Sequence, residues 1–342
     1  MLVFALAGGC MVTRRSAVTL VNPAEPSRIE AFMEPYAFKG RHIIDTGDLA
    51  HEEILHLMAM TDQVQEMGEA ARKLAVGKVL GTLFWEPSTR TRLSFESAMF
   101  RLGGSVLGFS EAQSSSVSKG ESLADTIRTV SLYTDIIAMR HPMEGAALAA
   151  SQYSTTPIIN GGDGAHLHPT QTLGDIYTLL REKDRLEGLR VGFLGDLLFG
   201  RTVHTLVRAL ARFGVEMHFF SPEGLNIPEY VRAHLRQSGA SFTEQEGMDD
   251  SIGQLDVLYV TRLQKERFFS EEEYLRKKNS YVVNLETLGR AKEDILILHP
   301  LPRNEEIAVE IDRLPNAGYF RQAGYGLQVR MALIAMCLGA LA

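Results

Sequence analysis

The stretch KVLGTLFWEPSTRTRLSFESAMFRLGGSVLGFS, residues 78–110, changes its local pattern twice. Its two ends, 78–85 and 105–110, are short apolar runs typical of buried strands. The segment between them has helical spacing, and Gly103 and Gly104 stop that helix. A strand, a helix and a second strand in this order predict a parallel pair with the helix as its crossover.

The same alternation continues along the chain. Apolar runs at 135–140 and 157–161 follow, separated by further helical patterns. A helical stretch then runs from near Pro169 to about Arg185, and the pattern restarts. The apolar runs of this second part are 189–196, 215–222, 256–262 and 295–302. The restart predicts an α/β protein of two domains, each a mostly parallel sheet flanked by helices.

Composition limits the classes of function. The 342 residues, 45% of them hydrophobic, are enough for two cores of ordinary domain size. The net charge is −7 and the chain has no Lys/Arg tract, which argues against nucleic-acid and membrane-surface partners. Cys10 and Cys337 lie far apart without metal-type spacing, so a reducing, cytoplasmic compartment is expected.

The amino-terminal extension, residues 1–35, has a composition of its own. Its first 24 residues lack Asp and Glu but include Arg14 and Arg15. The apolar run precedes these charges, which is the reverse of a secretory signal. The alternative to a cytoplasmic location is therefore import into an organelle through this extension.

Five polar residues stand together where the strand 78–85 meets the following helix. They are Ser88, Thr89, Arg90, Thr91 and Arg92. Ser88 or Thr89 is well placed to cap the helix, and a cap with exposed arginines is the simplest interpretation of Ser88 alone. However, a helix amino terminus attracts phosphate, and hydroxyl and guanidinium groups add donors for several oxygens of one dianion. The whole block therefore favours a phosphate site.

Other predicted strands end in similar chemistry. His168 and Gln171 follow the run 157–161. Further strand ends deliver Arg140, Arg201, Arg262 with Gln264, and the backbone around Pro300. Ligands of open parallel sheets bind outside the carboxyl ends of the strands, so we expect these residues to converge. One such arginine alone is typical of a surface residue, but three predict a pocket for substrates with several negative charges.

Ordered motifs extend from about residue 40 to the carboxy terminus. They are FWEPSTRTRLSFE, SKGESLADT, MRHP, GDGAHLHPTQTLGD, GDLLFGRTVH, YVTRLQKER and HPLPR. Together they resemble the aspartate carbamoyltransferase family, whose catalytic chain joins carbamoyl phosphate to L-aspartate in pyrimidine synthesis. Ornithine carbamoyltransferases are similar at STRTR, but they hold a cationic side chain and usually have HCLP near their end. Since HPLPR and TRLQKER suit a second carboxylate, aspartate is the expected acceptor and ornithine the alternative.

The resemblance implies which residues bind carbamoyl phosphate. Its phosphate is held by Ser88, Thr89, Arg90 and Thr91. Arg140 reaches the phosphate and the carbonyl oxygen, while His168 and Thr91 donate to that oxygen as it becomes an oxyanion. Gln171 and the backbone carbonyls of Pro300 and Leu301 fix the carbamoyl amino group.

The resemblance also implies how aspartate is bound and attacked. Arg201, Arg262 and Gln264 hold its two carboxylates, and its own amine is the nucleophile. Catalysis is then mostly positioning and charge stabilisation, with no cofactor and no metal. Closure of the two domains brings the half-sites together.

The segment SEAQSSSVSKGES, residues 110–122, consists of small and polar residues. Composition alone predicts a mobile linker. The resemblance instead implies that this loop supplies Ser115 and Lys119 to the site of a neighbouring subunit, with Lys119 also contacting aspartate. A homotrimer with shared active sites is therefore expected.

Two departures from the family pattern concern closure and effector response. Leu198 and Phe199 stand where some members have Lys-Tyr, and Ser118 stands where some have a second Lys. Partners beyond the trimer stay open: a separate regulatory chain and other enzymes of pyrimidine synthesis are both candidates.

The implied organisation has a short extension and two domains. They are the extension 1–35, a carbamoyl-phosphate-binding domain at 36–175 joined by the C-terminal helix 319–342, and an aspartate-binding domain at 176–318. The apolar run 327–341 is about 15 residues long and includes Arg330, short of the ~20 residues of a spanning helix. It predicts a buried helix that packs back on the first domain.

Three other classes of function compete with this interpretation. A dinucleotide dehydrogenase would need G-x-G-x-x-G, but VGFLGDLLFGRT has glycines at 192, 195 and 200 only. A metal hydrolase could use His166 and His168 with Asp163 or His299, although two histidines in this spacing are a weak signal. A binding protein without activity would hold carbamoyl phosphate but form no product.

Overall fold

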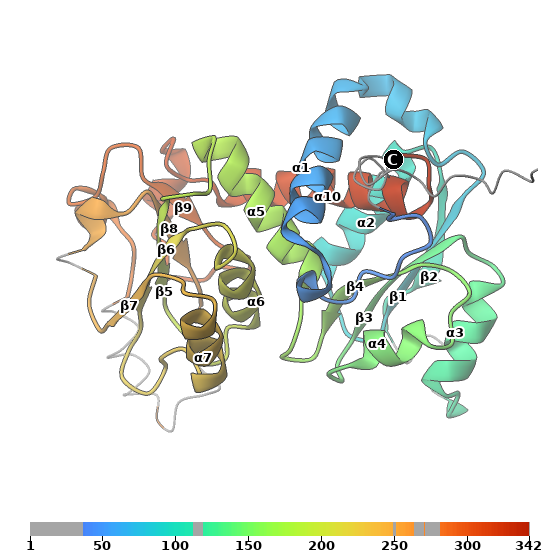
Figure 1. Ribbon diagram of the computed structural model, residues 1–342, viewed down its shortest axis with the longest axis horizontal. Helices are drawn as coiled ribbons and strands as arrows, with labels where there is room; N and C mark the ends of the chain where they lie inside the picture. Colours follow the sequence, from blue (N-terminus) through green and yellow to red (C-terminus); the bar gives the residue numbers. More distant parts are fainter. Residues whose placement is uncertain (1–36, 112–118, 249–250, 263–269, 271–280, 342) are drawn as a thin grey trace, which may run out of the picture. The chain divides into compact units, whose positions relative to one another are not determined.

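The computed structural model describes residues 37–111, 119–248, 251–262, 270 and 281–341. Two sheets organise this part of the chain (Figure 1). Their strand orders are β2-β1-β3-β4 and β7-β6-β5-β8-β9, and neighbouring strands pair in parallel throughout. The predicted α/β class with two parallel sheets flanked by helices is confirmed.

Three strands of the first sheet, β1, β3 and β4, are largely buried, whereas the edge strand β2 is mostly exposed. Its strands are β1 Val79–Phe84, β2 Ser105–Phe109, β3 Ile136–His141 and β4 Ile158–Asp163. Their connections contain α2 Thr89–Arg101, α3 Leu123–Ser131 and α4 Ala146–Ser151. Ile136 and Ala138 pack into one hydrophobic cluster, whereas Ile137 and Met139 pack into another. Successive side chains point to opposite faces of a strand, so the apolar run of β3 is explained by two covered faces.

The second sheet has the same construction. Its strands are β5 Arg190–Leu194, β6 Glu216–Phe220, β7 Phe242–Gln245, β8 Val257–Val260 and β9 Leu296–Leu298. Its helices include α6 Arg201–Leu210, α7 Glu229–Gln237 and α9 Leu285–Leu288. The apolar runs do not predict β7, because this edge strand reads FTEQ and leaves most of its residues exposed.

Three further helices are the longest of those that the structure describes. They are α1 His51–Glu66, α5 Pro169–Lys183 and α10 Tyr319–Cys337. α10 packs against α5, α2 and α1, which confirms that the C-terminal helix returns to the first sheet (Figure 1). In the described part of the chain, no helix has the length and apolar character to cross a membrane. The predicted domain boundaries stay a prediction; the one after residue 175 falls inside α5.

Two glycines allow α5 and α10 to lie close together. A Cβ atom at Gly174 would stand 3.1 Å from the Cα of Gly326 on the facing helix. This is closer than a methyl group and a backbone carbon normally approach, so a side chain at 174 forces the helices apart. Gly324, two residues along α10, has open space around it.

We expect Gly174→Ala to destabilise the protein by about 1–3 kcal/mol, because the added methyl group overpacks this helix crossing. The matched control is Gly324→Ala, which should be neutral or stabilising by up to about 1 kcal/mol, since alanine is the better helix former. Thermal unfolding of the two variants beside the parent protein measures the difference. Equal midpoints for the two variants would contradict the close approach.

Candidate active site

A cavity of about 790 Å³ lies at the carboxyl ends of strands from both sheets. The lining includes residues that follow β1, β4, β5, β8 and β9, and Arg140 near the end of β3. The predicted site residues that line it are Ser88, Thr89, Arg90, Thr91, Arg140, His168, Gln171, Arg201, Arg262, Pro300 and Leu301. The structure therefore brings together side chains up to about two hundred positions apart, as expected for strand ends in open parallel sheets.

The remaining predicted residues are Lys119 and three residues that the structure does not describe. Lys119 is exposed and is not among the residues that line the cavity of its own chain. Ser115, Ser118 and Gln264 fall outside the described residues. Their implied roles therefore stay predictions.

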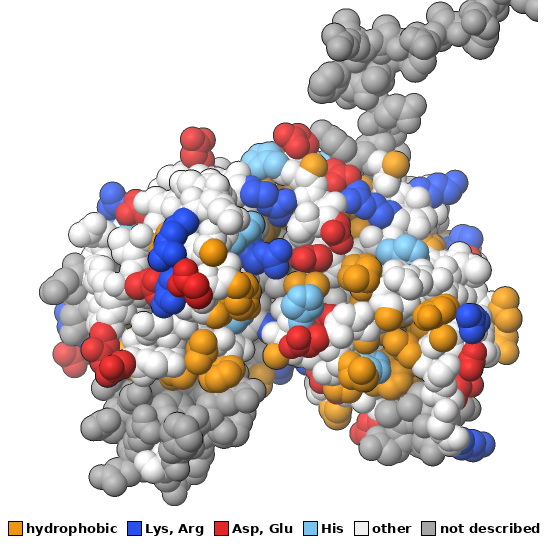
Figure 2. Space-filling model, turned by 60° about the horizontal axis from the view of Figure 1, so that its bottom comes forward, with side chains coloured by type: hydrophobic (Ala, Val, Ile, Leu, Met, Phe, Trp, Pro, Cys, Tyr) orange, Lys and Arg blue, Asp and Glu red, His pale blue; other side chains and the backbone are white. Residues whose placement is uncertain are grey.

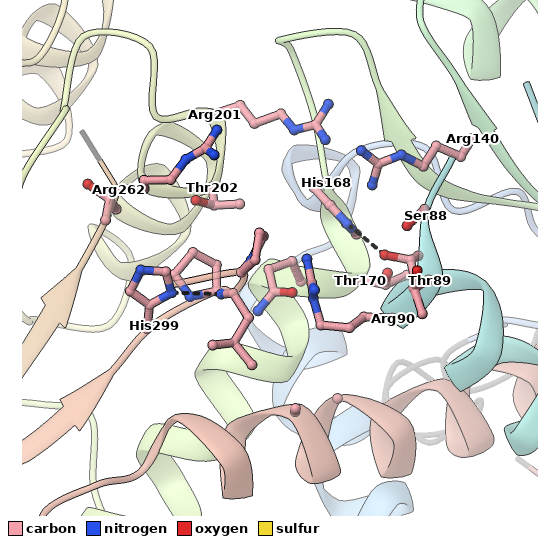
Figure 3. A pocket seen from close by; sticks show the side chains of 18 of the residues that line it. Ser88, Thr89, Arg90, Arg140, His168, Thr170, Arg201, Thr202, Arg262 and His299 are labelled. Atoms are coloured by element: carbon pink, nitrogen blue, oxygen red, sulfur yellow. Dashed lines mark hydrogen bonds between the residues drawn. The ribbon is translucent and has the colours of Figure 1, made fainter. Parts of the chain in front are cut away.

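The start of α2 forms one wall of the cavity. Ser88 is the N-cap residue, with φ −154° and ψ 97°, but its side chain makes no capping hydrogen bond. The expected side-chain cap is therefore wrong, although the helix begins where it was predicted. Because the hydroxyl does not cap the helix, Ser88 and the amino terminus of α2 both face the cavity as donors to an anion (Figure 3).

Arginines enter the cavity from both halves of the structure. Figure 3 shows Arg90 and Arg140 on the side of α2, and Arg201 and Arg262 on the side of the second sheet. Burial, followed by the charge of Arg140, lowers the pKa of Arg90 and that of Arg201. The guanidinium groups thus destabilise one another's charge, and a bound anion relieves that repulsion.

Two of these arginines, Arg140 and Arg201, are held in place by contacts within the protein. Arg140 binds the carboxylate of Glu86, which also lines the cavity. Arg201 donates through Nη1 to the backbone oxygen of Gly164, in the loop after β4. Each guanidinium is therefore anchored on one side, which leaves the site organised before a ligand arrives.

His168 lies at the centre of the cavity, directly before Pro169 at the start of α5 (Figure 3). Its side chain is buried, and burial followed by the charges of Arg201 and Arg140 sets its pKa well below 6.5. The imidazole is therefore neutral at pH 7. Its Nε2 lies 3.4 Å from Oγ1 of Thr91, and its buried Nδ1 has no hydrogen-bond partner. A neutral ring of this kind can donate one hydrogen bond to a substrate oxygen.

Arg330 of α10 is a cavity residue that the sequence-based prediction did not include. It is 5% exposed, donates to Oγ1 of Thr170 over 3.1 Å and stacks on the ring of Phe95. Burial lowers its pKa to about 10, and its Nε has no hydrogen-bond partner. A signal for it exists in the sequence: one arginine within an apolar helix is rarely buried without a function or a partner.

The loop after β9 carries the other predicted backbone groups. Leu301 donates its N–H to Nδ1 of His299 over 2.8 Å, so the ring proton lies on Nε2 and is donated to Oε1 of Glu306, also over 2.8 Å. Leu301 has a φ of +54°, which non-glycine residues seldom adopt. The ring of His299 thus holds a strained loop from which Pro300 and Leu301 line the cavity.

The histidines that the metal-hydrolase alternative requires have different partners. His166 is half exposed beside Asp163, and His299 is bound to Glu306. Within the described residues, no three His, Cys, Asp or Glu side chains are grouped as a metal site requires. The geometry gives that alternative no support.

Family models match the chain in two consecutive segments. Residues 41–181 match the carbamoyl-P binding domain of aspartate/ornithine carbamoyltransferases, and residues 187–337 match their Asp/Orn binding domain. The aspartate carbamoyltransferase catalytic subunit of Finegoldia magna is 53% identical over 302 residues, which cover 88% of this chain and 99% of the relative. That of Clostridium botulinum strain Alaska E43 is 53% identical over 305 residues, covering 89% and 99%.

Solved structures agree with these matches. The catalytic subunit of M. jannaschii aspartate transcarbamoylase superposes with a TM-score of 0.83 at 49% identity, covering 87% of this chain and 98% of that one. The Trypanosoma cruzi aspartate transcarbamoylase in complex with carbamoyl phosphate and aspartate has a TM-score of 0.82 at 36% identity, covering 89% and 98%. Both domain models, the fold and a cavity built for anions lead to one conclusion: this chain belongs to the aspartate/ornithine carbamoyltransferase family.

Proposed function

We propose that this chain transfers the carbamoyl group of carbamoyl phosphate to the amine of L-aspartate, giving N-carbamoyl-L-aspartate and phosphate. The observation that carries the proposal is the cavity in which arginines from both sheets surround the neutral His168. The family includes enzymes that act on aspartate and enzymes that act on ornithine. The relatives reported above are named aspartate carbamoyltransferases, which supports aspartate as the acceptor. The reaction is an early step of pyrimidine biosynthesis, which we place in the cytoplasm.

The phosphate group of the donor binds at the start of α2. Ser88, Thr89 and Arg90 supply donors around one dianion, and the helix amino terminus adds its partial positive charge. Arg140 bridges the phosphate and the carbonyl oxygen. Because Arg140 is bound to Glu86 in the structure, binding of the phosphate competes with that carboxylate.

The carbonyl oxygen becomes negatively charged as the amine attacks. His168 and Thr91 are placed to donate to it, and neutral His168 needs no proton from solvent to do so. Stabilising an oxyanion with donors that are already oriented lowers the barrier without reorganisation. The departing phosphate takes the proton that the amine loses, so the chain itself forms no covalent intermediate.

The acceptor binds on the side of the second sheet. Arg201 and Arg262 line that side of the cavity and offer donors to the two carboxylates of aspartate. Gln264, from the same motif, is proposed to join them. Catalysis then rests on holding two anions in reacting positions.

We also propose that the chain works as a homotrimer with shared active sites. Lys119 is exposed outside its own cavity, which suits a role at a neighbour's site. Large hydrophobic side chains are exposed on the half built around the first sheet, among them Leu93, Phe100, Leu132 and Tyr133. Figure 2 shows hydrophobic side chains gathered on this half. Contiguous exposed apolar surface favours association with another chain.

The substrate test uses a colorimetric assay for ureido products with carbamoyl phosphate and either aspartate or ornithine. Aspartate should be carbamoylated and ornithine should not, because the arginines of the second half repel a cationic side chain. Arg262→Ala should raise the KM for aspartate about 10- to 100-fold, because it removes one charge-assisted hydrogen bond to a carboxylate of aspartate. The binding of carbamoyl phosphate should change little. Arg236→Ala, at an exposed arginine of α7, is the control. Comparable turnover of ornithine would reject the acceptor assignment.

The second test concerns His168. His168→Ala should lower kcat about 10²- to 10³-fold, the usual cost of losing one oxyanion donor, while the fold is retained. His166→Ala should keep nearly full activity, because that exposed histidine does not line the cavity. Steady-state kinetics of both variants, with metal analysis of the parent protein, separate the roles. Full activity of His168→Ala would refute the donor, and stoichiometric zinc in the parent would revive the hydrolase alternative.

The third test asks whether Lys119 acts across a subunit boundary. Arg90→Ala and Lys119→Ala should each be nearly inactive alone, but trimers reassembled from a mixture should regain activity. A mixed trimer contains interfaces at which intact Arg90 of one subunit faces intact Lys119 of its neighbour, and those sites have every group. Native mass spectrometry shows whether hybrids form. Hybrids that form and stay inactive would return residues 110–122 to the linker interpretation.

A further inference from the structure

Behind the cavity lies a buried carboxylate to which no role has been assigned. Asp175, two turns into α5, is 0% exposed. It accepts hydrogen bonds from three side chains on three elements: Gln171 of α5, Tyr259 of β8 and Gln322 of α10. Asp175 does not itself line the cavity, whereas Gln171 and Gln322 do.

The chemistry of the carboxylate fixes the direction of both amides. Gln171 and Gln322 each donate through Nε2 to Oδ1 of Asp175, over 2.7 and 2.6 Å. An ionised carboxylate only accepts hydrogen bonds, so the nitrogen of each amide must face Asp175 and the oxygen must face away. Although burial raises the pKa of Asp175 to about 6, the group remains mostly ionised at pH 7.

One of these amide oxygens supports the loop after β9. Oε1 of Gln322 accepts the backbone N–H of His299 over 2.9 Å. The ring of His299 in turn accepts the N–H of Leu301, as described above. Asp175 is therefore linked through Gln322 to the loop that lines the cavity with Pro300 and Leu301.

The other amide oxygen belongs to Gln171, which lines the cavity. Because one N–H of its Nε2 is held by Asp175, the amide oxygen of Gln171 is left as an acceptor for a ligand. The loop after β9 lines the same cavity, and the backbone carbonyls of Pro300 and Leu301, which the family resemblance assigns to the carbamoyl amino group, are acceptors. A substrate group that meets acceptors from both sides must itself be a donor, and the amino group of a carbamoyl unit carries two N–H bonds.

We propose that Asp175 is a positioning residue that makes the cavity selective for a carbamoyl amino group, by holding Gln171 and the loop after β9 with their acceptors toward the substrate. The inference rests on the proposed function, since it concerns the same donor substrate. A purely structural role, in which Asp175 only ties α5, β8 and α10 together, would affect all ligands of the cavity alike.

The test compares three ligands of the full-length protein by calorimetry. Acetyl phosphate has the charge and size of carbamoyl phosphate but a methyl group in place of the amino group, and inorganic phosphate probes the start of α2 alone. Asp175→Leu keeps a branched side chain but removes the acceptor. It should weaken carbamoyl phosphate about 10- to 100-fold and the other two ligands less than about threefold, as expected for misplaced hydrogen-bond partners.

Tyr259→Phe is the matched control. It also removes one buried hydrogen bond to the same carboxylate, over 2.8 Å, but at Oδ2, whereas both amides donate to Oδ1. It should lower the thermal midpoint while leaving the preference for carbamoyl phosphate over acetyl phosphate unchanged. If Asp175→Leu does not fold, Gln322→Met replaces it, because it cuts the link to the loop and should show the same selective loss.

An unchanged preference in the folded Asp175 or Gln322 variant, or an equal loss for all three ligands, would overturn the inference. Formation of carbamoyl aspartate by the parent protein keeps that result separate from the proposed function. Absence of the product from the parent would overturn the proposed function and this inference with it.

Discussion

Mutual repulsion among arginine side chains around one cavity is the constraint on which the rest of this structure depends. Five arginines line the cavity, and the pKa of three of them, Arg90, Arg201 and Arg330, is lowered, in each case first by burial. Groups of like charge stay together only on a scaffold too rigid to let them separate. Two parallel sheets with both faces covered provide that rigidity, and the carboxyl ends of their strands deliver the arginines.

The helices that join the two sheets serve the cavity as well as the core. α5 begins beside His168 and carries Gln171 and Asp175 one turn apart on one side. α10 brings Gln322 and Arg330 to the same region, and Gly326 between them leaves room for the guanidinium, since a Cβ there would lie 3.0 Å from Nη1 of Arg330. Residues usually regarded as packing determinants thus also decide which polar groups reach the substrate.

The cavity contains charged arginines and a neutral histidine, and we assign them different roles. In the proposed function the arginines bind the charged ends of the substrates, where Coulomb attraction in a partly enclosed cavity is strong. In the proposed function the reacting carbonyl lies beside His168, which burial and neighbouring cations keep neutral. Burial first, and then the charges of Arg201, Arg140 and Arg330, lower the pKa of His168, so the positive field that attracts anions also favours its neutral form.

The sequence by itself determined the fold class, the order of eight of the nine described strands along the chain and most of the cavity. Apolar runs indicate buried strands wherever both faces are covered, and residues at strand ends must meet at one edge, so Arg140, His168 and Arg201 could be placed together in advance. The strand β7 was not predicted, because an exposed, polar edge strand has no such apolar run. Only the tertiary structure decided that the hydroxyl of Ser88 leaves its cap unmade, that Arg330 reaches the cavity and that Asp175 orients two amides. These features depend on contacts between α2, α5, α10 and the loop after β9, and local pattern carries no information about which distant side chains share a hydrogen bond.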